Sequence, residues 1–299
     1  MIKLGCNAML PVARPMPYPD NQDDQRNWQD VEKVIRMIYD LRLDIVDLQP
    51  DRGFRSTEPA YLYRIKLLCQ QCGLPIGFIG VGRGFVGIEE GPDGRVVGAP
   101  LPEDELQKRI TEVKVGIDQA AFMGAPMNRH FGGGIPDETP DRDALWQTMV
   151  HSFQEVADYA SGKGVLIGLH NHAPAVAPTG DDILRLLHEV DRENLTFILD
   201  TGQWWGSPGY WAGESNPEVD FYEFMEQTAP HATYVRAKIY KIDSGREENI
   251  DYERIMEILR KVNFNGNMSI VFEDRENNCS DTEAIELAAK YLRGLLADR

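Results

Sequence analysis

Four short apolar segments of this chain end in ionisable side chains, and this pattern constrains the fold more than any other feature. A strand that is buried on both faces of a parallel sheet is a near-continuous apolar run. Charged residues at the same end of several such strands therefore indicate a shared polar mouth. The segments are IGLHNH (167–172), FILDTG (197–202), YVRAK (234–238) and SIVFED (269–274). We expect His170, Asp200, Lys238 and Glu273 to converge there.

Eight strand candidates alternate with helical patterns along the chain. This alternation favours a parallel sheet, and eight such units in 299 residues close most naturally into a (β/α)8 TIM barrel. We expect residues 1–299 to form one barrel domain. The alternative is an open doubly wound sheet, which would normally carry a phosphate-binding glycine loop after its first strand, and the sequence has none there. The candidates are 2–8, 44–49, 75–82, 127–132, 165–171, 196–202, 233–239 and 268–273.

Two long connections are expected on the same face of the barrel. Residues 11–27 are rich in proline and aspartate, and residues 83–105 read as a small hairpin that turns at Pro92-Asp-Gly94. Connections of this length in compact domains are usually lids or oligomer contacts. We expect these two segments to shape the substrate site.

The net charge of the chain limits the classes of partner that it can bind. It has 31 basic and 48 acidic residues, a net charge of −17. A surface this acidic repels phosphate groups, so we expect neither nucleic acid nor an anionic membrane as a partner. No apolar run approaches ~20 residues, and the N-terminal segment lacks a signal-peptide cleavage pattern. The four cysteines do not suggest a disulfide framework in a chain of this length, which fits a reducing cytoplasm.

The acids and histidines at the strand ends are metal-ligand candidates. Asp200 and Glu273 each follow an apolar run, so each carboxylate needs a partner, either a divalent cation or a neighbouring Lys or Arg. His170 and His172 are two residues apart and would face the same side of a strand. Imidazole suits Mn, Fe, Co or Zn.

Basic and aromatic side chains surround these candidates. Arg129 and His130 end one strand, and Arg236 and Lys238 lie on another. They could hold a substrate carboxylate, polarise a carbonyl or stabilise an enediolate, or they could be counter-ions for the acids. Trp204 and Trp205 follow Asp200 and would stack on a sugar ring or pack a dimer contact.

These segments resemble the xylose isomerase-like TIM-barrel superfamily, the sugar phosphate isomerase/epimerase group that also contains endonuclease IV-like proteins. In that group strand 5 usually ends in Glu-Asn-His and strand 7 in His-x-Lys. The resemblance implies a metal held by Glu, Asp, His and Glu from strands 5 to 8. Asp200 and Glu273 match two of those ligands, whereas His170 replaces the first Glu and Arg236 replaces the His.

The resemblance therefore implies an altered metal site. Its expected ligands are His170, Asp200 and Glu273, with His172 or His130 filling a vacant place, and loss of the metal is the alternative. Manganese is the ion we expect first, with magnesium, cobalt and zinc as alternatives.

The activity implied by the resemblance is that of a metal-dependent isomerase or epimerase of a sugar or keto-sugar acid, acting through an enediolate. Glu273 and His170 would move protons, and Lys238 and Arg236 would stabilise negative charge. The residues expected to contact substrate are Arg129, His130, Asn171, Trp204 and Trp205.

Two other classes stay open. One is a lyase of the same group, a decarboxylase or dehydratase of an oxo-sugar derivative or a C-glycoside-cleaving subunit. The other is a non-catalytic sugar-binding or partner subunit. Family habit suggests a homo-oligomer.

Overall fold

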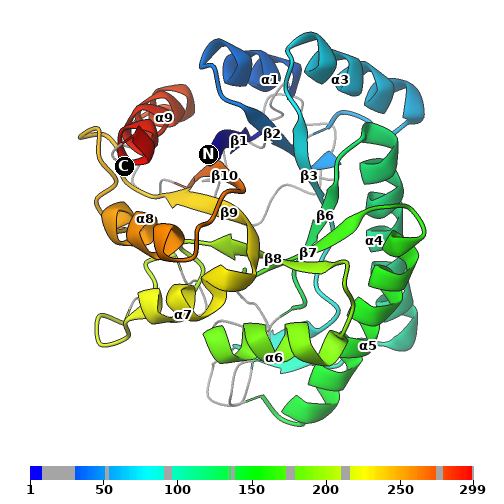
Figure 1. The fold of residues 1–299 in the computed structure, drawn as a ribbon. Coiled ribbons are helices and arrows are strands. Elements are labelled where there is room, and N and C mark those ends of the chain that lie inside the picture. The colour runs from blue at the N-terminus through cyan, green and yellow to red at the C-terminus, as the bar shows by residue number, and fades with distance from the viewer. Residues whose placement is uncertain are drawn as a thin grey trace.

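Eight parallel strands close into a barrel in the computed structural model, which confirms the sequence-based prediction (Figure 1). The model describes residues 1–8, 31–50, 54–90, 96–133, 135, 139–172, 179–209, 216–273 and 279–297. Around the barrel the strands follow the order β1-β10-β9-β8-β7-β6-β3-β2. They are β1 (Lys3–Asn7), β2 (Ile45–Leu48), β3 (Ile76–Gly80), β6 (Met127–His130), β7 (Leu166–His170), β8 (Leu195–Asp200), β9 (Ala232–Ile239) and β10 (Asn267–Phe272).

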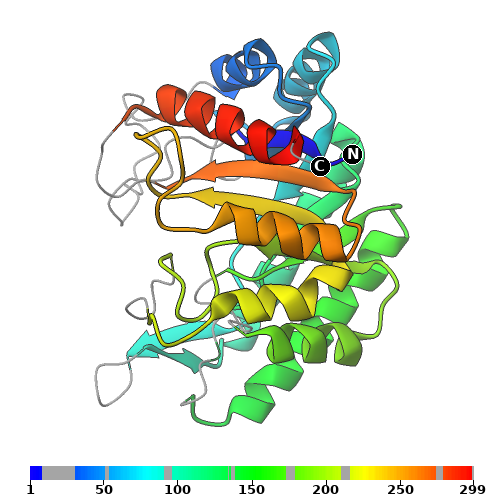
Figure 2. The same cartoon turned by 60° about the vertical axis from the view of Figure 1, so that its left-hand side comes forward.

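Helices pack around the outside of the barrel (Figures 1 and 2). Their inner faces are apolar because buried residues recur at helical spacing, as Met149, Phe153, Val156 and Ala160 do in one of them. None of the described helices is long and apolar enough to cross a membrane. The helices are α1 (Val31–Asp40), α3 (Pro59–Gln71), α4 (Glu103–Met123), α5 (Arg142–Ser161), α6 (Gly180–Val190), α7 (Phe221–Thr228), α8 (Tyr252–Lys261) and α9 (Asp281–Ala297), with a 3-10 turn, η2 (Ala229–His231).

The barrel interior contains a small apolar cluster of its own. Phe78, Met127, Ile198 and Tyr234 form a buried group separate from the core between strands and helices. The Phe78 and Tyr234 rings meet edge to face, with centroids 5.4 Å apart. Alternate side chains of one strand share a face, so Arg129 comes two positions after Met127 on the interior side, and Asp200 likewise follows Ile198. The interior therefore changes from apolar to ionisable toward the carboxyl ends of the strands.

A bulge at the start of β9 sets which of its side chains face the interior. Phe197 of β8 pairs with Ala232, but Ile198 pairs with Tyr234, so Thr233 is an extra residue on β9. After this bulge Asp200 pairs with Arg236. Arg236 and Lys238 thus belong to the same alternating set as Tyr234.

The expected hairpin follows β3. Strands β4 (Gly87–Glu90) and β5 (Val96–Ala99) pair in antiparallel fashion, which confirms the prediction for residues 83–105, although the turn itself lies outside the described residues. Phe85 N donates to Gly132 O at 2.7 Å, so the segment that leads into the hairpin lies against the connection after β6. The other long connection, residues 11–27, also lies outside the described residues.

Candidate functional site

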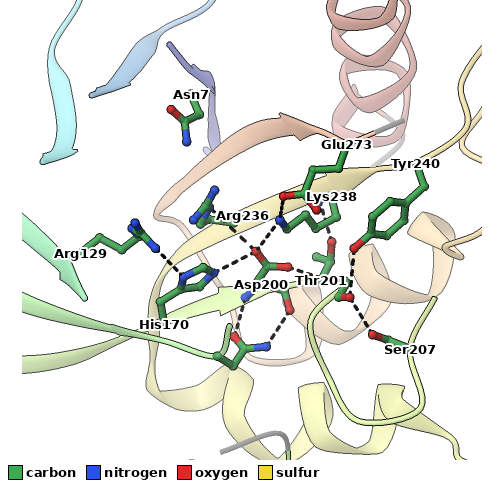
Figure 3. Close-up of polar contacts among 12 residues, drawn as sticks. Asn7, Arg129, His170, Asp200, Thr201, Ser207, Arg236, Lys238, Tyr240 and Glu273 are labelled. Carbon is green, nitrogen blue, oxygen red and sulfur yellow. Dashed lines mark hydrogen bonds and ion pairs between the residues drawn. The ribbon is translucent and has the colours of Figure 1, made fainter. Parts of the chain in front are cut away.

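A chain of buried polar contacts crosses the carboxyl ends of β6, β7 and β8 (Figure 3). Arg129 donates from Nη1 to Nδ1 of His170 at 3.0 Å, and Nε2 of His170 lies 2.9 Å from Oδ2 of Asp200. Their three side chains are buried. The strand ends thus meet as the sequence predicted.

His170 is held as a neutral imidazole with a defined tautomer. A guanidinium can only donate, so Nδ1 of His170 is the acceptor and the proton is on Nε2, which donates to Asp200. Burial lowers the pKa of His170 well below its usual value, and nearby Arg236, Arg129 and Lys238 lower it further. Both ring nitrogens are therefore engaged in the described structure.

Asn171 fixes the backbone at the end of β8. The Asp200 amide donates to Oδ1 of Asn171 at 2.8 Å, and Nδ2 of Asn171 donates back to the Asp200 carbonyl at 3.1 Å. The amide of Gly202 donates to Oδ1 of Asp200 at 3.0 Å. Asn171, which the sequence predicts to contact substrate, thus also holds the backbone of Asp200 through two hydrogen bonds.

Lys238 lies between the two predicted carboxylates. Its ammonium group donates to Oε1 of Glu273 and lies 3.7 Å from Oδ2 of Asp200 (Figure 3). The side chains of Lys238 and Asp200 are fully buried, whereas that of Glu273 is 16% exposed. Within this trio, Glu273 is thus the carboxylate that a substrate can reach.

The second cation of β9 lies on the same side of the strand. Nε of Arg236 is 3.9 Å from Oδ2 of Asp200 and has no hydrogen-bond partner, although the side chain is buried. Its Cζ lies 5.9 Å from the centroid of the Phe78 ring. Arg236 thus presents an unpaired N–H among apolar and ionic neighbours.

Residues outside the barrel hold the end of β9 in place. The Lys238 amide donates to Oγ1 of Thr201 at 2.9 Å, and the hydroxyl of Tyr252 donates to the Lys238 carbonyl at 2.6 Å. Tyr252 is the first residue of α8, so this helix is tied directly to the strand that carries both cations. Further along, Oε2 of Glu247 accepts from the amides of Tyr240 and Lys241.

Three aromatic predictions lie away from this cluster. His130, next to Arg129, faces the opposite side, where Nε2 contacts the Arg83 carbonyl at 3.0 Å and the ring packs 4.5 Å from that of Phe85. Burial lowers the pKa of His130 to about 3. Trp204 is fully buried against aromatic rings of β8 and α7, so it belongs to the core. Trp205 is 43% exposed.

His172 lies beside this cluster, with its ring against two other rings. Its ring is 5.2 Å from the ring of His170 and stacks on Phe131 at 5.3 Å. Burial also lowers its pKa well below the usual value. The two histidines are thus neighbours, as the spacing predicted.

Three polar residues of the interior were not singled out from the sequence. Nδ2 of Asn7 donates to Oε1 of Gln49 at 3.2 Å. Asn7 ends β1 and Gln49 directly follows β2, so their positions at strand ends could have singled them out. Asp47 lies inside an apolar strand and accepts from the Tyr234 hydroxyl at 2.6 Å. Burial raises the pKa of Asp47 to about 6.

The donor set does not fit the divalent ion implied by the resemblance. His170 uses both ring nitrogens, Arg236 is a cation, and the Lys238 ammonium holds Glu273. Among the described residues, no group of three or more His, Cys, Asp or Glu side chains is arranged to hold a metal ion. We therefore derive no chemistry from such an ion.

A separate hollow of about 410 Å³ opens at the amino ends of the strands. Lys3 is the one ionisable residue in its lining, which includes Ile76, Pro126 and Asn267. In a TIM barrel the reactive face is the carboxyl one. The ionisable cluster, rather than this hollow, is therefore the candidate site.

The comparisons with known proteins agree with the fold. The model of one family, the xylose isomerase-like TIM barrel, matches residues 40–295. The chain belongs to this family. No protein with a curated description matches the sequence.

Several solved structures resemble this chain over nearly its whole length. L-ribulose 3-epimerase superposes with a TM-score of 0.70 at 17% identity, covering 99% of this chain and 94% of that one. D-allulose 3-epimerase from Methylomonas sp. gives 0.67 at 15% identity, covering 98% of each chain. The 3-keto-D-glucoside 4-epimerase of E. coli gives 0.66 at 14%, covering 99% of each. At these identities the likeness shows the fold alone.

Proposed function

We propose that the chain is an isomerase or epimerase of a keto-sugar or keto-sugar acid, acting through an enediolate that cationic side chains stabilise. The observation that carries the proposal is the position of Lys238, buried between Asp200 and the partly exposed Glu273. The structural neighbours are sugar epimerases, which supports a sugar substrate.

Glu273 is the proposed base. It is the reachable carboxylate of the trio, and it would remove the proton from the carbon next to a carbonyl. Lys238, already bonded to Glu273, and Arg236, with its unpaired Nε–H, would stabilise the enediolate oxygens. Return of a proton to the opposite face of the same carbon gives an epimer, and return to the adjacent carbon gives an isomer.

His170 takes a different role from the one expected of it. Its Nδ1 accepts from Arg129, so it has no lone pair ready for a substrate proton. We assign it the orientation of Asp200, to which it donates. Asp200 in turn lies within 4 Å of both β9 cations and keeps them at the mouth.

Proton exchange in heavy water tests this proposal. The protein would be incubated in D2O with a panel of keto-sugars and keto-sugar acids, and deuterium next to the carbonyl would be measured by NMR. We expect incorporation with at least one substrate. Glu273→Gln should slow it by about 10²- to 10⁴-fold. The matched control is Glu248→Gln, which removes a surface partner of Lys241 and should leave exchange unchanged. No incorporation from the whole panel would contradict the proposal.

A lyase is the second candidate, and one observation favours it. Among the described cluster residues near Lys238, one carboxylate is exposed, whereas epimerisation between two faces of a carbon is simplest with two bases. Loss of CO2 needs no base to abstract a proton, and the cations would stabilise the resulting enolate. Product mass separates the two: it is unchanged after isomerisation and falls by CO2 or water after a lyase reaction.

A further inference from the structure

Three buried cationic side chains, Arg129, Arg236 and Lys238, gather at the mouth of the barrel. We infer that Arg236 and Lys238 take the place of a divalent ion, so that this barrel binds no such ion and works without one. The inference rests on the proposed function only for the use of that charge. The absence of metal binding is argued from the contacts themselves.

Two of the expected metal ligands, His170 and Asp200, already have hydrogen-bond partners. Nε2 of His170 donates to Asp200, and its Nδ1 accepts from Arg129. Oδ1 of Asp200 accepts the Gly202 amide, while Oδ2 takes the His170 contact. An ion would have to displace several of these contacts at once.

The charges in the described part of the barrel interior already balance. Three carboxylates, Asp47, Asp200 and Glu273, face three cations, Arg129, Arg236 and Lys238. Five of these six side chains are buried. A divalent ion would add two uncompensated charges to a region where unpaired charge is costly.

The cations offer a substrate oxygen a binding partner of their own. Nε of Arg236 is buried and has no acceptor, which is costly unless a ligand supplies one. A planar guanidinium suits the paired oxygens of an enediolate or a carboxylate. The unpaired N–H therefore marks where a substrate oxygen binds, a role that a metal ion would otherwise fill.

Metal binding by the purified protein tests the inference without any substrate. After dialysis against EDTA, the protein would be incubated with Mn²⁺ or Co²⁺, desalted, and its metal content measured by plasma mass spectrometry. We expect no bound ion and a melting temperature that neither ion nor EDTA changes. About one ion per chain, lost in both Asp200→Asn and Glu273→Gln, would overturn the inference.

A conversion variant sharpens the test. His170→Glu with Arg236→His replaces a neutral donor by a carboxylate and a cation by an imidazole, beside Asp200 and Glu273. We expect this double variant to bind about one Co²⁺ per chain, seen as visible absorption bands. A folded double variant that binds none would count against the inference, and far-UV circular dichroism establishes folding. If it does not fold, the wild-type measurement decides alone.

The two proposals fail in different ways. Metal bound by a wild type that exchanges sugar protons would overturn the inference and keep the proposed function. A metal-free protein that exchanges no substrate proton would do the reverse.

Discussion

Nη1 of Arg129 lies 3.0 Å from Nδ1 of His170, and this contact decides which ring nitrogen carries the proton. Nitrogen-15 NMR should therefore show His170 protonated at Nε2. Arg129→Met should raise the pKa of His170, because a nearby guanidinium disfavours imidazolium. The pKa should still stay below the usual value, since burial is the larger cause. The nitrogen-15 chemical shifts of the exposed His151 ring serve as the control.

Loss of the ammonium at the centre of the mouth should destabilise the fold. Lys238→Met leaves Asp200 and Glu273 without their shared cation, and breaking a buried pair costs about 3 kcal/mol or more. Urea unfolding measures the change. Adding Glu273→Gln to Lys238→Met should recover part of the lost unfolding free energy. If the double variant instead loses the sum of the two single losses, the pair is not coupled.

Asp47 should make the protein less stable as pH rises. Its pKa is raised from 3.8 to about 6 in the fold, so the folded state holds the proton more tightly than the unfolded chain does. This stabilisation is fully present at a pH below the pKa of Asp47 in the unfolded chain, and it is lost as pH rises through the folded-state pKa of about 6. The free energy of unfolding of wild type should therefore fall by on the order of 2 kcal/mol between pH 4 and pH 7 relative to that of Asp47→Asn, which has no carboxyl group to titrate there.

The measurement for Asp47 is urea unfolding at both pH values. Asp40→Asn, at an exposed position, is the matched control for the chemical change itself. A constant offset between Asp47→Asn and wild type at the two pH values would count against the sign argued here.

The two adjacent tryptophans should behave differently. Trp204→Ala removes a fully buried ring between β8 and α7 and should cost about 3–5 kcal/mol of unfolding free energy. Trp205→Ala removes a side chain that is 43% exposed and should change stability by about 0.5 kcal/mol or less. Equal effects in urea unfolding would show that the core placement of Trp204 is wrong.

Much of the fold was predictable because each strand is a short apolar run, and a residue's position at the end of such a run is visible in the sequence. That reasoning brought His170, Asp200, Lys238 and Glu273 to one place. It could not choose between neighbours such as Arg129 and His130, because alternation lets only one of the two face inward and the register decides which.

The predicted metal site shows a second limit of prediction from sequence. Residue types at strand ends suggest ligands, but which atom is free depends on pairwise contacts. The engagement of both His170 nitrogens and the insertion of Lys238 between two carboxylates bring together residues from β6, β7, β8 and β9 with Glu273, which follows β10. Asp47 escaped notice for a related reason, since it interrupts an apolar strand instead of ending one.

The bulge at Thr233 means that the chemistry of the barrel mouth depends on the register of β9 as much as on its residue types. Without that extra residue, Asp200 would lie opposite Val235, and the next interior position would be Ala237. The same segment would then line the barrel with small apolar side chains and turn both cations toward the helices. A single extra residue at the amino end of β9 thus decides whether ionic or apolar side chains of this strand line the barrel interior.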